Sequence, residues 1–210
     1  WEAGCGSGQL SLTLGDRFAC VIATDPSAAQ LEHAQPHRFV RYARATAEAS
    51  GLAPGVADLV VAAQAAHWFD LAAYYAEVRR VGRSDAVVGL VTYGLVTVAD
   101  AVDPVIHGFY AQELGPYWPP GRRHVDQAYR SLPFPFEPIA APELEMRADW
   151  ALADFIGYVE TWSAVRALQQ ARGDAPLAAF QRALAVAWGP PATRRAVRWP
   201  LTLRVGRVGR

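Results

Sequence analysis

Three glycines at alternate positions, Gly4, Gly6 and Gly8, place the tightest limit on how this chain can fold. They follow Trp1-Glu2-Ala3, which we interpret as the end of a strand, and they precede a predicted helix over residues 9–16. A turn of this kind lets the backbone pass close to a bound ligand, because a side chain at those positions would collide with it. The turn therefore predicts a ligand site at the end of a buried strand.

Short apolar runs rich in β-branched residues recur along the first half of the chain. Such runs are typical of strands buried on both faces of a parallel sheet, and predicted helices separate some of them. The predicted strands are 18–24, 38–43, 58–63 and 86–93, and the predicted helices after the first one are 26–33 and 72–81. We therefore expect an α/β fold built from right-handed βαβ units.

The pattern changes after Tyr93. The next segment mixes prolines, glycines and aromatics, and it follows the strand end that faces the ligand crevice in open α/β sheets. Beyond it we predict strands over 143–150 and 195–205 and helices over 152–170 and 176–188. We expect one domain over residues 1–210 with a cofactor-binding half (1–94), a substrate-cap insert (95–138) and C-terminal strands and helices (139–210).

The composition excludes several classes of protein. With 52% apolar and 19% charged residues the chain is not disordered. Its 20 basic residues, all arginine, are balanced by 20 acidic ones, so it lacks the charge surplus of a sequence-independent nucleic-acid binder. The absence of lysine also excludes Schiff-base chemistry.

The cysteine count and the lengths of the apolar runs indicate where the protein is located and which partners it lacks. Two cysteines and no long apolar run predict a cytoplasmic chain with no metal site and no membrane partner. We expect a monomer or a homodimer. Because the chain opens inside a strand that leads straight into its glycine turn, we expect the natural protein to carry further residues before Trp1.

Two acidic residues flank the turn. Asp25 ends the second predicted strand, where a carboxylate can accept both hydroxyls of a ribose; its competing interpretation is a helix N-cap. Glu2 precedes the turn, where it would repel a pyrophosphate and suit an ammonium group, unless it is simply an exposed charge at a strand end. Gly8 comes one residue earlier than the last glycine of a dinucleotide-binding turn, so an NAD(P)-dependent oxidoreductase is the weaker alternative.

Together these residues resemble the class I S-adenosylmethionine-dependent methyltransferases. The resemblance rests on Glu2-x-Gly4-x-Gly6-x-Gly8, on Asp25 and on Ala47-Glu48, and residues 62–70, 158–164 and 199–206 narrow it to the trans-aconitate-type small-molecule subgroup, with a methyltransferase type 11-like domain. It implies a Rossmann-like, seven-stranded and mostly parallel sheet flanked by helices, with a cap inserted after the fifth strand. S-adenosyl-L-methionine would be the cofactor and S-adenosyl-L-homocysteine the product.

The resemblance assigns a role to each part of the cofactor site. Residues near the turn would line the methionine moiety, Asp25 would hold the ribose, and the segment after the fourth strand would lie under the sulfonium. Cofactor binding is expected at Glu2, Gly4, Cys5, Gly6, Gly8, Asp25, Pro26, Ser27, Thr46, Ala47, Glu48, Gln64 and Ala65. Thr46 stands where relatives often have Asp, and residues 82–86 replace the usual turn before the fifth strand.

The remaining assignments concern the substrate. His67 and Trp68 follow a buried strand at the crevice end and are the expected catalytic residues. Substrate binding is expected at Tyr93, Tyr110, Trp118, Arg122, Arg123, Tyr129 and Trp162. The alternatives to these functional roles are a structural His67, a solvated loop at Arg122-Arg123, and tryptophans that belong to the core.

The expected reaction is carboxyl O-methylation of a small organic acid by in-line methyl transfer. A carboxylate acceptor needs no base, whereas an alcohol or amine would need one, and His67 is the candidate for that role. A non-catalytic methyltransferase-like domain that binds a ligand or partner is the alternative.

Overall fold

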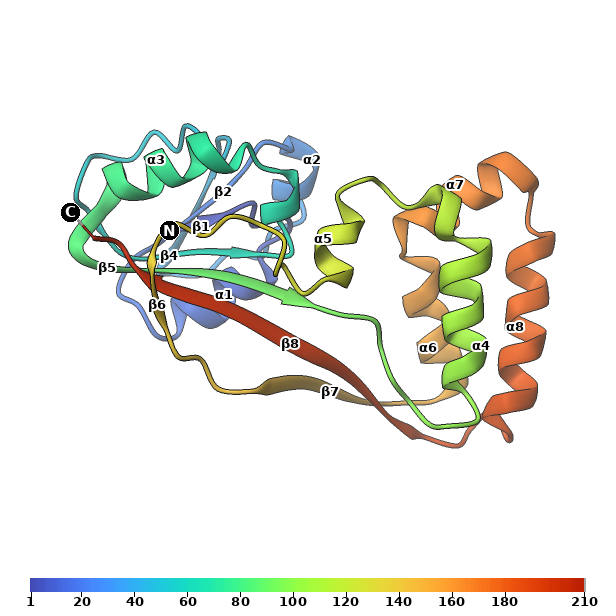
Figure 1. The fold of residues 1–210 in the computed structure, drawn as a ribbon. Helices are drawn as coiled ribbons and strands as arrows, with labels where there is room; N and C mark the ends of the chain where they lie inside the picture. The colour runs from blue at the N-terminus through green and yellow to red at the C-terminus, as the bar shows by residue number, and fades with distance from the viewer. Residues whose placement is uncertain (210) are drawn as a thin grey trace. The chain divides into compact units, whose positions relative to one another are not determined.

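The computed structural model describes residues 1–209, which form two compact units (Figure 1). Unit 1 contains Trp1–Tyr93, His124–Glu143 and the C-terminal stretch from Leu201, and unit 2 contains Gly94–Arg123 and Leu144–Pro200. This division differs from the three consecutive parts expected from the sequence. Residues 124–143 join the cofactor-binding half, and residues 144–200 join the segment that follows the fifth strand.

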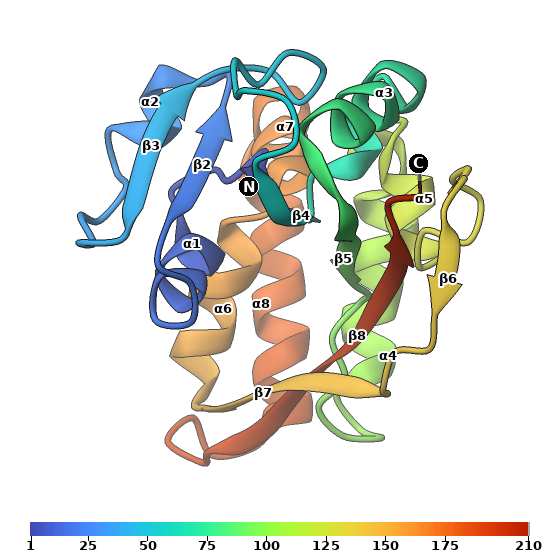
Figure 2. The same cartoon turned by 90° about the vertical axis from the view of Figure 1, so that its left-hand side faces the viewer.

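A mixed sheet with flanking helices forms unit 1, as expected for an α/β fold (Figure 2). Its strand order is β3-β2-β1-β4-β5-β8-β6, in which the first five strands of the chain are parallel and β8 is antiparallel to β5 and β6. The strands are β1 (Glu2–Ala3), β2 (Val21–Asp25), β3 (Val40–Arg44), β4 (Ala57–Ala63), β5 (Gly82–Tyr93), β6 (Glu137–Ile139) and β8 (Arg195–Arg207).

The sheet has eight strands rather than the expected seven, counting β7 (Leu144–Trp150), which pairs with β8. The additional strand is β6, which contains Pro138. Proline cannot donate to a strand ladder, so a sequence that contains it argues against a central strand. The edge position of β6 explains how the proline is tolerated.

Short helices cover the sheet of unit 1. They are α1 (Gln9–Gly15), α2 (Ala28–Leu31), η1 (Ala66–Trp68) and α3 (Leu71–Val81), while α5 (Arg122–Asp126) spans the boundary between the units. Asp70 begins α3, since its carboxylate accepts the N–H groups of Ala72 and Ala73 at 3.1 and 3.2 Å. The buried face of α3 packs on Val60 of β4 and Val88 of β5 in one hydrophobic cluster.

The turn expected over residues 82–86 is wrong. β5 begins at Gly82, which pairs with Ala57 of β4, and the register shifts before Val87 pairs with Leu59. The intervening residues are therefore part of an irregular strand. Arg83 within this stretch forms an ion pair with Asp58.

Unit 2 is mainly helical. Its elements are α4 (Asp103–Gly108), η2 (Phe109–Glu113), η3 (Gly115–Tyr117), β7, α6 (Leu152–Glu160), α7 (Ser163–Arg172) and α8 (Ala175–Trp188). The single helix expected over residues 152–170 is wrong, because Trp162 adopts an extended conformation between α6 and α7. Stacked rings of Phe109 and Phe180, 4.1 Å apart, join η2 to α8. No helix within residues 1–209 has the length and apolarity needed to cross a bilayer.

Two neighbouring tyrosines of α3 give a test of this packing. The hydroxyl of Tyr74 is fully buried and has no hydrogen-bond partner among residues 1–209. The Tyr74→Phe variant should raise the free energy of unfolding by about 1 kcal/mol, because it removes an unsatisfied buried polar group. Chemical denaturation measures the change.

Tyr75 provides the matched control. Its hydroxyl donates to the carbonyl of Pro133 at 2.7 Å, so Tyr75→Phe should lower the free energy of unfolding by about 1 kcal/mol. Destabilisation of the Tyr74→Phe variant would contradict the assignment of an orphaned hydroxyl.

Candidate functional site

The glycine loop between β1 and α1 is held in left-handed backbone conformations. The φ angles of Gly4, Gly6 and Gly8 are +68°, +56° and +82°. A Cβ on Gly4 would lie 2.6 Å from Cβ of Ala65, and one on Gly8 would lie 2.4 Å from the hydroxyl of Tyr42. At Gly6 the nearest described atom would be 3.8 Å away. Packing within the protein therefore explains two of the glycines, and Gly6 leaves room for a ligand to approach the backbone.

Asp25 ties this loop to the next βα turn. One of its carboxylate oxygens accepts the N–H of Gly6 and the other accepts the N–H of Ser27, each at 2.9 Å. The N-cap of α2 is Ser27, whose hydroxyl accepts the N–H of Gln30 at 3.3 Å. Asp25 is thus not the cap residue. It lies at the carboxyl end of β2, next to the open side of the loop, and Pro26 beside it is exposed.

Glu2 lies under the loop and is almost completely buried. Its side chain accepts a hydrogen bond of 2.5 Å from the hydroxyl of Ser11 on α1. Burial raises the pKa of Glu2 to about 7, although the Ser11 hydroxyl and the Trp1 ammonium both act to lower it. The interpretation of Glu2 as an exposed strand-end charge is therefore wrong.

Two other residues under the loop were not identified from the sequence. Ser11 is buried in α1, and Tyr42 of β3 packs against Gly8. A serine within a short helix carries no signal for such a role. The requirement for glycine at position 8 is the one indication that a bulky group lies there.

Cys5 has no nucleophilic character. Burial raises the pKa of its thiol to about 12, and the nearby carboxylates of Glu2 and Asp25 act in the same direction. The thiolate is the reactive form of cysteine. Its role in the loop is therefore that of a small buried residue.

The three residues expected to bind the cofactor at positions 46–48 have different roles in the structure. Thr46 is exposed, and its backbone forms an isolated bridge with Ala49. Ala47 is buried in the hydrophobic cluster of unit 1. The carboxylate of Glu48 accepts the N–H of Asp70 at 3.0 Å, which fixes it at the start of α3. A cofactor contact from this segment stays a prediction.

Gln64 follows β4 in a strained conformation. Its φ of +52° lies in the left-handed region, which is costly for residues other than glycine. The side-chain amide donates to the carbonyl of Tyr93 at 3.2 Å and its oxygen accepts the hydroxyl of Thr92 at 2.8 Å. These bonds hold the start of the 64–69 segment beside Gly4, which contacts Ala65 closely.

His67 and Trp68 lie on η1 in the same segment. His67 is half-buried, whereas Trp68 is 63% exposed and is therefore not a core residue. Nδ1 of His67 lies 2.8 Å from the hydroxyl of Tyr129. Tyr129, which is expected from the sequence to bind substrate, is fully buried, and its hydroxyl contacts His67.

Unit 2 brings together most of the other expected substrate residues. The rings of Tyr110, Trp118 and Trp162 lie 4.9 to 5.8 Å from one another, and we call them the aromatic cluster. The guanidinium of Arg122 lies over the Trp118 ring at 4.7 Å and donates to the Tyr110 hydroxyl at 2.6 Å. Arg123 is exposed. The paired arginines therefore differ, and Arg122 is not part of a solvated loop.

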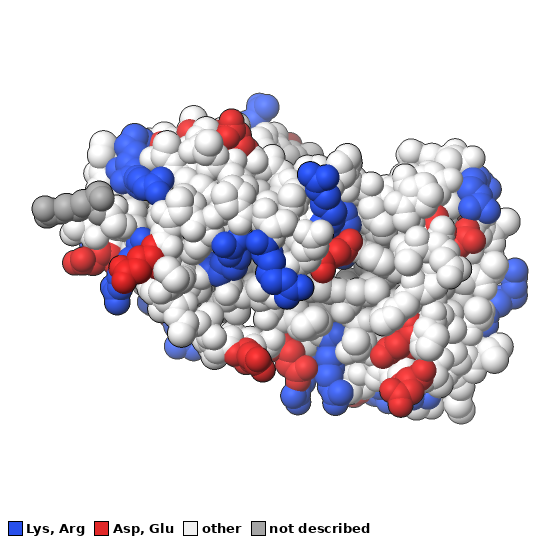
Figure 3. All heavy atoms as spheres, viewed as in Figure 1, with Lys and Arg blue, Asp and Glu red and all other residues white. Residues whose placement is uncertain are grey.

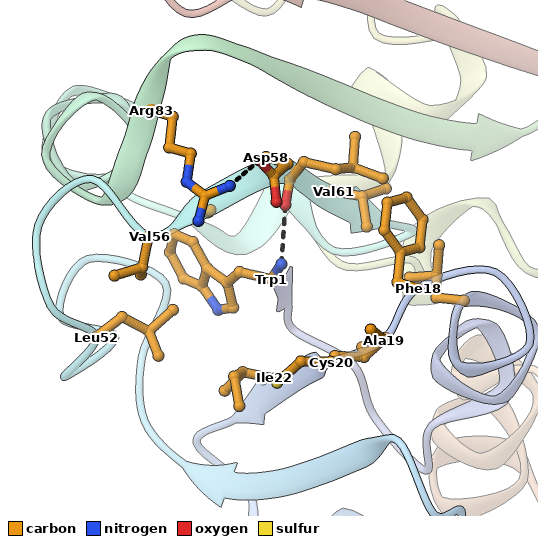
Figure 4. A pocket seen from close by; sticks show the side chains of 14 residues that line it. Trp1, Phe18, Ala19, Cys20, Ile22, Leu52, Val56, Asp58, Val61 and Arg83 are labelled. Carbon is orange, nitrogen blue, oxygen red and sulfur yellow. Dashed lines mark hydrogen bonds and ion pairs between the residues drawn. The ribbon is translucent and has the colours of Figure 1, made fainter.

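A pocket of about 310 Å³ in unit 1 is separate from the glycine loop (Figure 4). Its walls include Val21 and Ala57, which begin β2 and β4, and Trp1, whose ammonium donates to the carbonyl of Leu59 at 2.8 Å. It is therefore at the amino ends of the parallel strands. Ligands of open α/β sheets bind at the carboxyl ends, where the glycine loop and Asp25 are found.

Comparison with known proteins gives consistent matches. A family model described as "Methyltransferase domain" matches residues 1–89. A solved structure described as "a Putative Type II Methyltransferase from Anaeromyxobacter dehalogenans" is 48% identical, with a TM-score of 0.92 over 99% of this chain and 88% of that one. A putative methyltransferase from Bacillus halodurans, 15% identical over 100% of this chain and 91% of that one, shares the fold with a TM-score of 0.53.

Two curated relatives also match. A "Putative methyltransferase" of Dictyostelium discoideum is 34% identical over 81% of this chain, and a "Probable S-adenosylmethionine-dependent methyltransferase" of Saccharomyces cerevisiae is 32% identical over 40% of it. The chain spans 66% of the length of the first relative and 32% of the second.

The burial of Glu2 predicts a pH dependence of stability. In the unfolded chain Glu2 ionises near its usual pKa of 4.5, whereas in the folded chain it keeps its proton to about pH 7. The free energy of unfolding should therefore fall between these pH values, by about 3 kcal/mol from this group. Urea unfolding at a series of pH values measures the fall, which Glu2→Gln should abolish.

Glu77 serves as the control because its shift has the opposite sign. A hydrogen bond from Arg80 lowers the pKa of Glu77 to about 2, so its stabilising contribution is present above pH 4.5 and is lost toward pH 2. Glu77→Gln should lower the free energy of unfolding by a constant amount above pH 4.5 and change its pH dependence only in this acidic range. An unchanged slope between pH 4.5 and 7 in Glu2→Gln would disprove the assignment to Glu2.

Proposed function

The chain belongs to the methyltransferase family, and on that premise we propose that it transfers a methyl group from S-adenosyl-L-methionine to the carboxylate of a small organic acid. The observation that carries the proposal is the arrangement of Asp25 and Gly6 at the carboxyl ends of the strands. There the carboxylate of Asp25 accepts a hydrogen bond from the loop. It lies beside Gly6, the one glycine of the loop that packs against no close neighbour.

The residues of the loop suit this cofactor. Asp25 uses both oxygens for backbone N–H groups, but a carboxylate has about four acceptor positions and can also bind ribose hydroxyls. Glu2 lies under the loop on the β1 side, where its carboxyl group would favour an ammonium group. Gln64 and Ala65 lie against Gly4 and would border the sulfonium end.

The acceptor is inferred from unit 2 and from the overall charge. Arg122 is held in a fixed plane by Tyr110 and Trp118, and a guanidinium matches the geometry of a carboxylate. The aromatic cluster beside it offers apolar surface to the body of a small acid. Acidic and basic side chains are interspersed on the face drawn in Figure 3, and with zero net charge they favour a small molecule over a nucleic acid.

The proposed reaction needs no general acid or base from the protein. S-adenosyl-L-methionine supplies an electrophilic methyl group, and a carboxylate is already anionic at neutral pH. The protein contributes by orienting the acceptor and excluding water, which are positioning effects. On this proposal Asp25 and the glycine loop bind the cofactor, and Arg122 binds the acid.

The direct test has two steps. S-adenosyl-L-homocysteine should raise the melting temperature of the chain, because a ligand that binds only the folded state stabilises it. Methyl transfer to a panel of carboxylic acids, phenols and amines then identifies the acceptor class. Binding without transfer to any acceptor would favour a non-catalytic domain, and binding of NAD(P) in its place would favour an oxidoreductase.

The Asp25→Ala variant tests the ribose assignment. It should weaken binding of S-adenosyl-L-homocysteine by about 2–3 kcal/mol, because a charged acceptor of buried hydroxyl groups is lost. Asp103→Ala is the control, since the Asp103 carboxylate also accepts two backbone N–H groups but does so in unit 2. Calorimetry should find that Asp103→Ala binds S-adenosyl-L-homocysteine with the affinity of the wild type. Equal affinities for wild type and Asp25→Ala would remove the ribose role.

The adjacent arginines allow a similar comparison for the acceptor. Arg122→Gln should raise the KM for the acid about tenfold or more, because a charged hydrogen bond to a carboxylate is lost, while cofactor affinity stays the same. Arg123→Gln should leave KM close to wild type, since Arg123 is exposed. Steady-state kinetics would count against the proposal if the two variants behaved alike.

A further inference from the structure

Gln64 has a backbone conformation that would cost least for glycine. Its φ angle is +52°, and within residues 1–209 only Ala128 and Tyr129 share a positive φ with it among the residues other than glycine. Glycine adopts this left-handed conformation without a steric penalty, whereas a residue with a side chain is strained in it. What glutamine adds at position 64, and glycine would lack, is its side chain.

The side-chain amide of Gln64 is bonded at both ends to β5. Its nitrogen donates to the carbonyl of Tyr93 at 3.2 Å, and its oxygen accepts a hydrogen bond from the hydroxyl of Thr92 at 2.8 Å. The orientation of the amide is determined, because the carbonyl of Tyr93 can only accept and must therefore face the nitrogen. The backbone N–H of Gln64 donates to the carbonyl of Val91 at 2.9 Å. Three consecutive residues of β5 thus hold Gln64 in place.

The segment that follows Gln64 packs directly on the glycine loop. A Cβ on Gly4 would lie 2.6 Å from Cβ of Ala65 and 3.1 Å from Cζ of Phe69, so these two residues fill the space that the glycine leaves. Residues 64–69 therefore border the candidate cofactor site on the side of β4. Because Gln64 begins this segment, the turn at Gln64 determines how closely the segment approaches the loop.

We propose that Gln64 is a positioning residue, whose two side-chain hydrogen bonds to β5 hold the 64–69 segment against Gly4 and so keep the cofactor site assembled. The inference rests on the proposed function, in which the glycine loop binds S-adenosyl-L-methionine. Loss of the two bonds lowers the fraction of molecules in which the segment is in place. The apparent affinity for the cofactor then falls by the same factor.

Two substitutions of Gln64 separate the side chain from the backbone conformation. Gln64→Gly removes the amide and adopts the left-handed conformation freely, whereas Gln64→Ala removes the amide and keeps the strain. Both should weaken the binding of S-adenosyl-L-homocysteine about tenfold, because each loses the same two hydrogen bonds. Calorimetry measures the affinities. Wild-type affinity in Gln64→Gly would overturn the proposal, since the backbone conformation would then be sufficient without the side chain.

Thr92 tests the same anchor from the side of β5, where it is buried. Thr92→Val keeps the shape of the side chain and removes the hydroxyl, so it should weaken binding of S-adenosyl-L-homocysteine about fivefold. Thr92→Ser keeps the hydroxyl and should bind nearly as the wild type does. In a Gln64→Gly background, Thr92→Val should have no further effect, because its partner is already lost. An equal effect in both backgrounds would indicate a packing defect in β5 and would overturn the proposal.

Amide hydrogen exchange of the whole chain tests the anchor without a ligand. The N–H of Trp68 donates to the carbonyl of Ala65 at 2.9 Å within the segment. It should exchange about tenfold faster in Gln64→Gly than in the wild type, because the segment opens more often. The N–H of Thr97, which donates to the carbonyl of Arg198 in unit 2, is the control and should exchange at the wild-type rate. Unchanged exchange at Trp68 would overturn the proposal.

The two measurements separate this inference from the proposed function. Faster exchange at Trp68 together with unchanged affinity for S-adenosyl-L-homocysteine in Gln64→Gly would overturn the link between the segment and the cofactor site. If S-adenosyl-L-homocysteine does not bind the wild type while exchange at Trp68 is faster in Gln64→Gly, the proposed cofactor fails and the anchoring of the 64–69 segment by Gln64 stands.

Discussion

One carboxylate organises the candidate cofactor site. Asp25 accepts hydrogen bonds from the backbone of Gly6 and of Ser27, so it joins the glycine loop to the start of α2. Because Asp25 is the last residue of β2, the position of the loop is set by the sheet itself. The left-handed conformation of Gly6 leaves its N–H directed at this carboxylate and its α-carbon open. The geometry of the loop is thus fixed by hydrogen bonds within the protein.

The elements that the sequence predicted well are those with strong local signals. The buried β-branched runs of β2 and β4 and the glycine loop are recognisable because a few neighbouring residues determine them. The break at Trp162 and the strand at Pro138 were missed, since neither follows the local preference of its segment. Both depend on contacts with distant residues, which a periodic pattern does not encode.

The site followed the same rule. Asp25 could be selected because it ends a predicted strand beside a glycine turn, and its two backbone partners lie close to those elements. The pairing of His67 with Tyr129 could not be predicted from the sequence, because it depends on how unit 1 incorporates residues 124–143. The burial of Glu2 was also unforeseen, since it depends on the serine of α1 that lies against it.

The pairing of β5 with β8 has a consequence for the order in which the protein is made. β5 forms its antiparallel ladder with residues of β8 that follow unit 2 in the chain. A nascent chain on the ribosome therefore exposes one unpaired edge of β5 until β8 has been synthesised. Open strand edges are templates for aggregation, so the emergence of β8 is the step that closes the sheet on this side.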